Sequence, residues 1–293
     1  MAQFNGWLRQ NAGMAWRGLA RSTLIAAAAA CLGAAAVAAQ ELALIPAPDG
    51  STLMRTLVYR PQGPGPFRLA VIAHASTQNP VRRARLPLPR YGTAAAWLAA
   101  RGYLVALPQR PGHGETGGPY LEDQGGCAGA DHARAGLATA ASIEAAIRHL
   151  TARPDVRRDG IVVLGHSAGG WGAVALASRN PPGVAAVIGF APGRGGRSFD
   201  RANHNCAPDR LVAAAEGFGR TARIPALWIY AENDSYFAPA LARRMAAAYR
   251  GAGGRLALHL LPRFGEEGHA LLAAREGVPA WGPIVAAFLA NLK

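Results

Sequence analysis

The chain has 293 residues, of which 51% are hydrophobic and 16% are charged, and its formal net charge is +14. This length and composition allow one large α/β domain or two small ones around a sizeable core, and they exclude a largely disordered chain. The basic residues are nearly all arginines, scattered without interleaved aromatic side chains, which argues against a nucleic-acid-binding protein.

Residues 1–39 are predicted to be a secretory signal peptide. Three arginines are the only charged residues of this segment, and an alanine-rich apolar run follows at 24–38, with small residues before Gln40. The run is shorter than the roughly 20 residues that a membrane span requires, so no stable membrane anchor is expected after cleavage. A lipoprotein acylated at Cys31 is the less favoured alternative, because the apolar stretch continues past this cysteine. We therefore expect an exported protein, periplasmic or secreted, whose folded domain occupies residues 40–293.

Export changes how the cysteines are interpreted. If Cys31 leaves with the signal peptide, Cys127 and Cys206 remain, and two cysteines in an oxidising compartment favour a disulfide. Two buried thiols are the alternative. Neither cysteine lies in a CxxC motif, so the sequence gives little support for a metal or redox centre.

From residue 40 onward, strand patterns and helix patterns alternate along the chain. Strands are predicted at 41–46, 52–59, 67–75, 103–108, 161–164, 184–190, 224–230 and 256–261, and helices at 91–100, 131–151, 171–178, 238–249 and 281–292. The first two strands are separated by a Pro-Asp-Gly turn and should form an edge hairpin. The rest of the pattern predicts an α/β fold, with a mostly parallel eight-stranded sheet covered by helices on both faces.

One long interruption separates two of these strands, at residues 193–222. It begins with a glycine-rich stretch, contains Cys206 and ends in a short helix near 211–218. A lid over a pocket is one interpretation, and a plain surface crossover is the other.

The segment 161–170, with the sequence IVVLGHSAGG, carries the strongest local signal. Four apolar residues of a buried strand lead into a G-x-S-x-G pattern, and a helix follows. A sharp turn of this kind strains its central residue, and the flanking glycines remove side chains that would collide there. The turn should present the hydroxyl of Ser167 above the sheet edge as a nucleophile, whereas an inert serine in a glycine-rich turn is the alternative.

A serine hydroxyl needs a general base, usually a histidine oriented by a carboxylate. In a sheet of this kind the chain order should be serine, acid, histidine. Asp234 follows the strand 224–230 and is preferred over Glu232, which lies closer to the apolar part of that strand. His269 follows the last strand and is the best placed of the eight histidines. The predicted triad is therefore Ser167, Asp234 and His269.

The reaction also needs donors for a developing oxyanion. The backbone N–H of Ala168, next after the nucleophile, should supply one of them. The second should come from the loop after the third strand, with the N–H of Ser76 preferred over that of Ala75. Side chains expected to line the substrate pocket are His74, His113, His166 and Tyr236.

These motifs, GHSAGG, AEND, GHALL and AHAST, occur in the order of the α/β-hydrolase superfamily, which the chain resembles over most of residues 42–292. Within it, the chain is similar to the dienelactone-hydrolase-like group, to which the segment PGHGETGG also fits. It departs from true dienelactone hydrolases, whose nucleophile is a cysteine, because Ser167 stands at that position. This departure points to ordinary esters as substrates.

The expected protein is an exported serine hydrolase, specifically a carboxylesterase that acts on a small-molecule ester without metal or cofactor. The same triad also fits peptide or thioester cleavage and acyl transfer. The segment 232–235 also resembles that of cutinase-like polyesterases. A non-catalytic binding protein on a hydrolase scaffold is the alternative from another class of function.

Overall fold

The computed structural model describes residues 39–292, which contain one eight-stranded sheet. Its strands lie in the order β1-β2-β4-β3-β5-β6-β7-β8. Their bounds are β1 Ala39–Pro46, β2 Leu53–Arg60, β3 Arg68–Ala73, β4 Tyr103–Pro108, β5 Ile161–His166, β6 Val184–Phe190, β7 Ala226–Ala231 and β8 Leu256–Leu261. β1 and β2 form the antiparallel hairpin at one edge, β2 pairs antiparallel with β4, and the remaining strands are parallel. The predicted mostly parallel sheet is confirmed.

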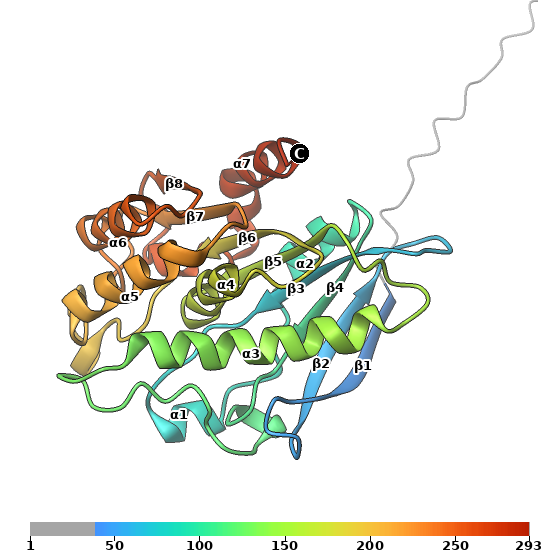
Figure 1. The fold of residues 1–293 in the computed structure, drawn as a ribbon, viewed down its shortest axis with the longest axis horizontal. Helices are drawn as coiled ribbons and strands as arrows, with labels where there is room; N and C mark the ends of the chain where they lie inside the picture. The colour runs from blue at the N-terminus through green and yellow to red at the C-terminus, as the bar shows by residue number, and fades with distance from the viewer. Residues whose placement is uncertain (1–38, 293) are drawn as a thin grey trace, which may run out of the picture. The chain divides into compact units, whose positions relative to one another are not determined.

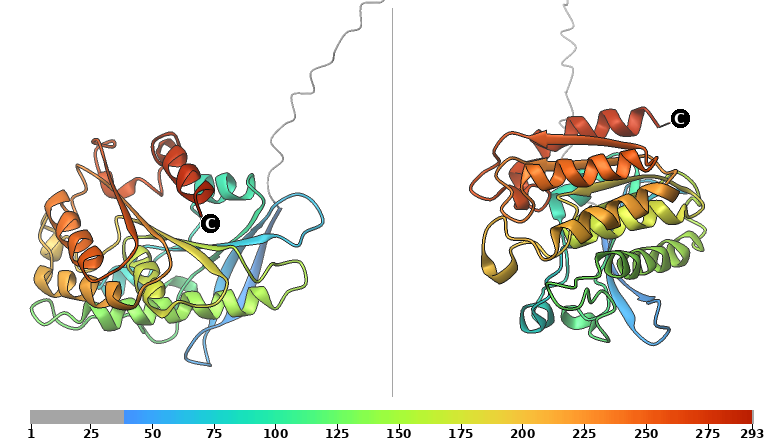
Figure 2. Two further views of the ribbon diagram at one scale, coloured as in Figure 1. Left: turned by 45° about the horizontal axis from the view of Figure 1, so that its top comes forward. Right: turned by 60° about the vertical axis from the view of Figure 1, so that its left-hand side comes forward.

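Helices cover both faces of this sheet. Their bounds are α1 Pro80–Ala84, α2 Gly92–Ala99, α3 His132–Thr151, α4 Ala168–Arg179, α5 Pro208–Thr221, α6 Pro239–Gly251 and α7 Val278–Ala290. α3, α4, α5 and α6 pack on one face, with α3 and α4 in front of the strands in Figure 1. α2 and α7 lie together on the other face (Figure 2). α1 was not expected from the sequence; it is a single turn that Asn79 caps by accepting a hydrogen bond from the Arg82 N–H.

The apolar content of the strands explains this layering. Every residue of β4, β5 and β7 is buried, which is typical of parallel strands that have helices on both sides. β5 lies at the point where the strand order reverses, with β3 on one side and β6 on the other. Ligands of open α/β sheets bind at the carboxyl ends of strands at such a point. The fold therefore places the site at the end of β5.

The interruption at 193–222 has two parts with different surroundings. Its second half is α5, which buries Leu211, Ala214 and Phe218 in the core and packs against α4 and α6. This helix belongs to the layer that covers the sheet and is not a cap over the pocket. The first half, 193–207, is an irregular segment that runs along the end of the sheet where β5 ends.

The structure contains the predicted disulfide between Cys127 and Cys206. The bond joins the loop before α3 to the irregular segment 193–207, across a sequence separation of 79. Both cysteines contact the Ser198 hydroxyl, at 3.2 and 3.4 Å. The disulfide thus fixes this segment covalently to the body of the domain.

The predicted signal peptide and the possible acylation site Cys31 lie outside the described residues. Within residues 39–292, none of the helices has the length and hydropathy that crossing a bilayer demands.

Candidate active site

Ser167 stands at the turn between β5 and α4, as the sequence predicts. Its backbone has φ 54° and ψ −118°, an unfavourable conformation for a residue with a side chain. Its N–H donates to the Phe190 carbonyl at 2.9 Å, which holds the turn against β6. The flanking glycines are required, because a Cβ on Gly165 would collide with the Gly169 backbone, and a Cβ on Gly169 with the Ala73 carbonyl. The strained backbone of Ser167 therefore depends on the glycines at 165 and 169.

The structure brings Asp234, on the loop after β7, and His269, on the loop after β8, together. His269 Nδ1 lies 3.0 and 3.2 Å from the two carboxylate oxygens of Asp234, which is 2% exposed. Asp234 Oδ1 also accepts the backbone N–H groups of Tyr236 and Phe237, at 2.8 and 3.0 Å. A carboxylate can only accept, so the proton of the imidazole is on Nδ1 and Nε2 carries the lone pair. Glu232, the alternative acid, is exposed.

The loop that carries His269 lies against the end of β5. His166, next to Ser167 in the chain, hydrogen-bonds through Nε2 to the His269 carbonyl at 2.7 Å, and the two rings are 4.9 Å apart between centroids. Within the described residues, Ser167 Oγ and His269 Nε2 have no hydrogen-bond partner. Hydrogen bonds between a nucleophile and its base are often long without substrate and tighten in the complex.

Side chains beyond the predicted triad hold His269 in place. Glu267 Oε1 accepts the His269 N–H at 3.0 Å and the Ser235 N–H at 3.1 Å. Its other carboxylate oxygen accepts the Ser235 hydroxyl, so Glu267 joins the loop after β8 to the loop that carries Asp234. Tyr236 stacks on the His269 imidazole, with ring centroids 4.0 Å apart and an angle of 18° between the planes. This role of Glu267 was not predicted from the sequence.

Two of the three candidate oxyanion donors face the same pocket as Ser167. Ala168 opens α4, where the first N–H groups have no partner inside the helix, and both Ala168 and Ser76 line the pocket. The N–H of Ala75 instead donates to the Tyr91 hydroxyl at 3.2 Å. The Ser76 hydroxyl is hydrogen-bonded to His113 Nε2 at 2.7 Å, and this bond fixes the position of Ser76. Ser76 therefore fits the second donor better than Ala75 does.

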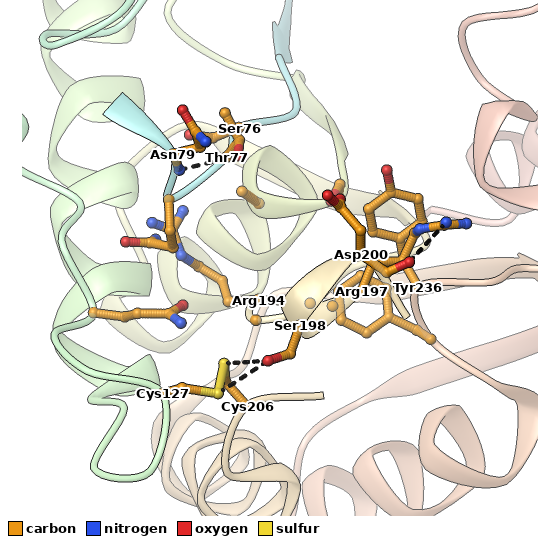
Figure 3. Close-up of a pocket in the computed structure, with 18 of the residues that line it drawn as sticks. Ser76, Thr77, Asn79, Cys127, Arg194, Arg197, Ser198, Asp200, Cys206 and Tyr236 are labelled. Carbon is orange, nitrogen blue, oxygen red and sulfur yellow. Dashed lines mark hydrogen bonds between the residues drawn. A yellow bond between two sulfur atoms is a disulfide. The ribbon is translucent and has the colours of Figure 1, made fainter. Parts of the chain in front are cut away.

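The pocket in front of Ser167 has a volume of about 570 Å³, and both polar and apolar residues line it. In Figure 3, Ser76 and Thr77 lie on one side, Tyr236 and Arg197 on the opposite side, and Arg194 and the disulfide on the remaining walls. Arg82 and Asp200 form an exposed ion pair among the lining residues, at 3.2 Å. Tyr236 was expected to line the pocket and does so.

The other three predicted pocket residues, His74, His113 and His166, do not line this pocket. His74 donates from Nδ1 to the Ala75 carbonyl at 2.7 Å and accepts the Arg110 N–H on Nε2 at 3.1 Å. His113 donates to the carbonyls of Arg110 and Pro111, and burial lowers its pKa to about 4. These histidines support the loops around the pocket, and the structure does not place them among its lining residues, where the sequence led us to expect them.

A buried charge cluster that was not predicted from the sequence lies behind the pocket wall. Glu122 is 1% exposed and pairs with two guanidinium groups, that of Arg110 at 3.3 Å and that of Arg194 at 3.0 Å. Arg194 also donates to the Tyr120 hydroxyl at 2.8 Å, and Arg110 Nη1 is buried without a partner within the described residues. Arg110 and Arg194 are 84 positions apart, so no local pattern in the sequence indicated their convergence.

We expect the Glu122→Gln variant to lose about 3–5 kcal/mol of unfolding free energy, because it leaves two buried cations without a counter-charge. Burial alone would raise the pKa of Glu122, but Arg110, His113 and Arg194 outweigh it and hold the pKa well below its ordinary 4.5. The ionised carboxylate therefore stabilises the fold above about pH 4.5 and loses this contribution as the pH falls further. Urea unfolding at several pH values measures both effects.

A matched control is Glu216→Gln, which removes an exposed partner of Arg220. This control should unfold within experimental error of the parent protein, since exposed ion pairs contribute little. Equal stability of the Glu122→Gln variant and the parent at pH 7 would show that the cluster does not depend on this charge.

No metal centre is apparent at the site: residues 39–292 contain no group of three or more His, Cys, Asp or Glu side chains placed to hold an ion. The functional groups at the site are the side chains of Ser167, His269 and Asp234 and the two candidate backbone donors.

Comparison with known structures supports the same fold. A putative dienelactone hydrolase from Klebsiella pneumoniae aligns with a TM-score of 0.57 and 14% identity, over 87% of this chain and 100% of that one. An esterase from Pyrococcus furiosus aligns at 0.61 and 13% identity, over 87% and 93%. An acylaminoacyl peptidase from Pyrococcus horikoshii aligns at 0.62 and 12% identity, over 88% of this chain, which spans only 42% of the peptidase. At these identities the similarity establishes the fold alone.

Sequence comparison identifies the family. No curated protein sequence is similar enough to count as a match. The model of the dienelactone hydrolase family matches residues 55–281, which include the whole constellation described above. The structure and this match confirm the resemblance inferred from the motifs, and the chain belongs to the dienelactone hydrolase family.

Proposed function

We propose that this hydrolase is a serine carboxylesterase. The observation that carries the proposal is the convergence of Ser167, Ala168 and Ser76 on one pocket, together with the hydrogen-bonded Asp234–His269 pair. The imidazole of that pair packs on Tyr236 and Phe237 of the same pocket wall. A nucleophile, a base in the required tautomer and two donors are the parts that acyl transfer needs.

In the proposed reaction, Ser167 Oγ attacks the ester carbonyl carbon while His269 Nε2 takes the hydroxyl proton. The carbonyl oxygen becomes an oxyanion that accepts hydrogen bonds from Ala168 N–H and Ser76 N–H. The C–O bond to the alcohol breaks, the alcohol leaves with the proton held by His269, and Ser167 carries the acyl group. Water then attacks with His269 as base, which releases the carboxylic acid and restores Ser167.

The substrate class follows from the pocket. Its walls include the partly exposed side chain of Arg197 and the exposed Arg82–Asp200 ion pair, and charged groups of this kind disfavour burial of a long alkyl chain. Short acyl groups are therefore the proposed substrates. Export is also part of the proposal, and the disulfide supports it, since such bonds persist mainly in oxidising compartments.

A fluorophosphonate probe followed by an ester panel tests this proposal. The probe should label Ser167, as peptide mass mapping would show, and p-nitrophenyl acetate should be cleaved faster than the palmitate ester. A panel with anilides, thioesters and a polyester film separates the other reactions of the same triad. A folded protein that takes up no probe and cleaves nothing in the panel would instead be a binding protein on a hydrolase scaffold.

A further inference from the structure

A chain of hydrogen bonds connects the three loops that surround the nucleophile. The Ala75 N–H, after β3, donates to the Tyr91 hydroxyl at 3.2 Å. That hydroxyl lies 3.0 Å from Nδ1 of His166, at the end of β5. Nε2 of the same imidazole lies 2.7 Å from the carbonyl of His269, after β8. The side chains of Tyr91 and His166 therefore link the loop after β3 to the loop after β8.

The direction of every bond in this chain is fixed. The His269 carbonyl only accepts, so His166 Nε2 carries the proton and its Nδ1 is the acceptor. The Tyr91 hydroxyl consequently donates to Nδ1 and accepts from Ala75. Burial lowers the pKa of His166 to about 3 and raises that of Tyr91 to about 12, so both groups stay neutral at physiological pH.

The backbone of Tyr91 is held in a strained conformation. Tyr91 precedes α2 with φ 37° and ψ 43°, in the left-handed region that residues with side chains rarely adopt. Such strain persists only where surrounding contacts hold it. Here it brings the phenol ring to His166, with ring centroids 5.9 Å apart and the planes nearly perpendicular.

We propose that Tyr91 and His166 are positioning residues for the reaction, which rests on the proposed function above. By binding the Ala75 N–H, Tyr91 turns that peptide away from the pocket and leaves the Ser76 N–H as the second oxyanion donor. By binding the His269 carbonyl, His166 fixes one side of a residue whose N–H Glu267 holds on the other. Neither side chain lines the pocket, so both act through other groups.

Positioning can be separated from a purely structural role by kinetics. Groups that align an oxyanion donor and a base act in the transition state, so their loss lowers kcat and leaves KM nearly unchanged. Loss of a structural hydrogen bond lowers the unfolding temperature without this selective effect on kcat.

The decisive variant is Tyr91→Phe, which removes one hydroxyl and keeps the ring. We expect kcat for p-nitrophenyl acetate to fall about 10- to 100-fold with KM within about twofold of the parent. Tyr249→Phe is the matched control, because it removes a buried phenol hydroxyl on α6 that has no hydrogen-bond partner within the described residues. Its kcat should equal that of the parent. An unchanged kcat in Tyr91→Phe, or an equal loss in both variants, would overturn the proposal.

A second pair of variants keeps the test decisive if Tyr91→Phe folds poorly. His166→Gln retains an amide donor for the His269 carbonyl, whereas His166→Leu has a similar volume and no donor. The glutamine variant should keep at least about tenfold more kcat than the leucine variant. Equal kcat values in the two would show that the hydrogen bond does not matter.

Probe labelling distinguishes failure of this proposal from failure of the proposed function. If the parent protein labels at Ser167 and turns over ester while the Tyr91 and His166 variants match it, only the positioning role is wrong. If the parent itself neither labels nor turns over ester, the proposed function is wrong and the positioning role falls with it.

Discussion

Replacing Ser167 with alanine is expected to lower kcat/KM for p-nitrophenyl acetate by at least about 10⁴-fold, because no other group at the turn can form the acyl-enzyme. The fold should survive, since Ser167 Oγ has no hydrogen-bond partner within the described residues whose loss would leave a buried group unpaired. The strained backbone conformation is as unfavourable for alanine as for serine. Steady-state kinetics of the purified variant measures the loss of kcat/KM, and thermal unfolding shows whether the fold survives.

Ser198→Ala is the control for this experiment. Ser198 lines the same pocket and touches the disulfide sulfurs, but it lies on the segment 193–207, away from the turn. Its loss should change kcat/KM by no more than a few-fold. If the Ser167→Ala variant turned over ester at the parent rate, Ser167 would not be the nucleophile.

Asp234→Asn is expected to reduce kcat by about 10³- to 10⁴-fold at neutral pH while barely changing the structure. The side-chain oxygen of asparagine can still accept the N–H groups of Tyr236 and Phe237, as Asp234 Oδ1 does. The amide nitrogen then faces His269 Nδ1 and donates to it, so the imidazole proton must move to Nε2. An imidazole protonated on Nε2 cannot take the proton of Ser167.

The tautomer change gives this variant a signature of its own. Nitrogen NMR of labelled histidine should show the His269 proton on Nδ1 in the parent and on Nε2 in the Asp234→Asn variant. Asp209→Asn, an exposed partner of Arg244, is the control and should leave kcat unaltered. Parent-level kcat in Asp234→Asn would mean that another group orients the base.

The sheet and the nucleophile turn could be predicted because their causes are local or repetitive. Buried strands need apolar side chains on both faces, and in the sequence such strands are short apolar runs such as 161–164. The turn needs glycine at 165 and 169, where a side chain would strike the backbone. Asp234 and His269 followed from chain order, since strand ends of a parallel sheet meet at one edge.

The second layer of the site could not be predicted, because it depends on partners from distant segments. A histidine at the end of a strand can face the pocket or the core with the same sequence around it. His74 faces inward because the Arg110 N–H and the Ala75 carbonyl satisfy its two nitrogens. In the same way, nothing near Glu122 in the sequence indicates that Arg194 will reach it. The direction of such side chains is decided by three-dimensional packing.

The bond between Cys127 and Cys206 has a practical consequence for anyone who prepares this enzyme. Both cysteines line the cavity. Within residues 39–292, their disulfide is the sole covalent cross-link between the segment 193–207 and the loop before α3. Material made in a reducing cytosol would enter assays with two free thiols and an untethered wall. Its apparent affinity for substrate would then vary with the redox history of each batch, so the oxidation state should be verified before kinetic constants from different hosts are compared.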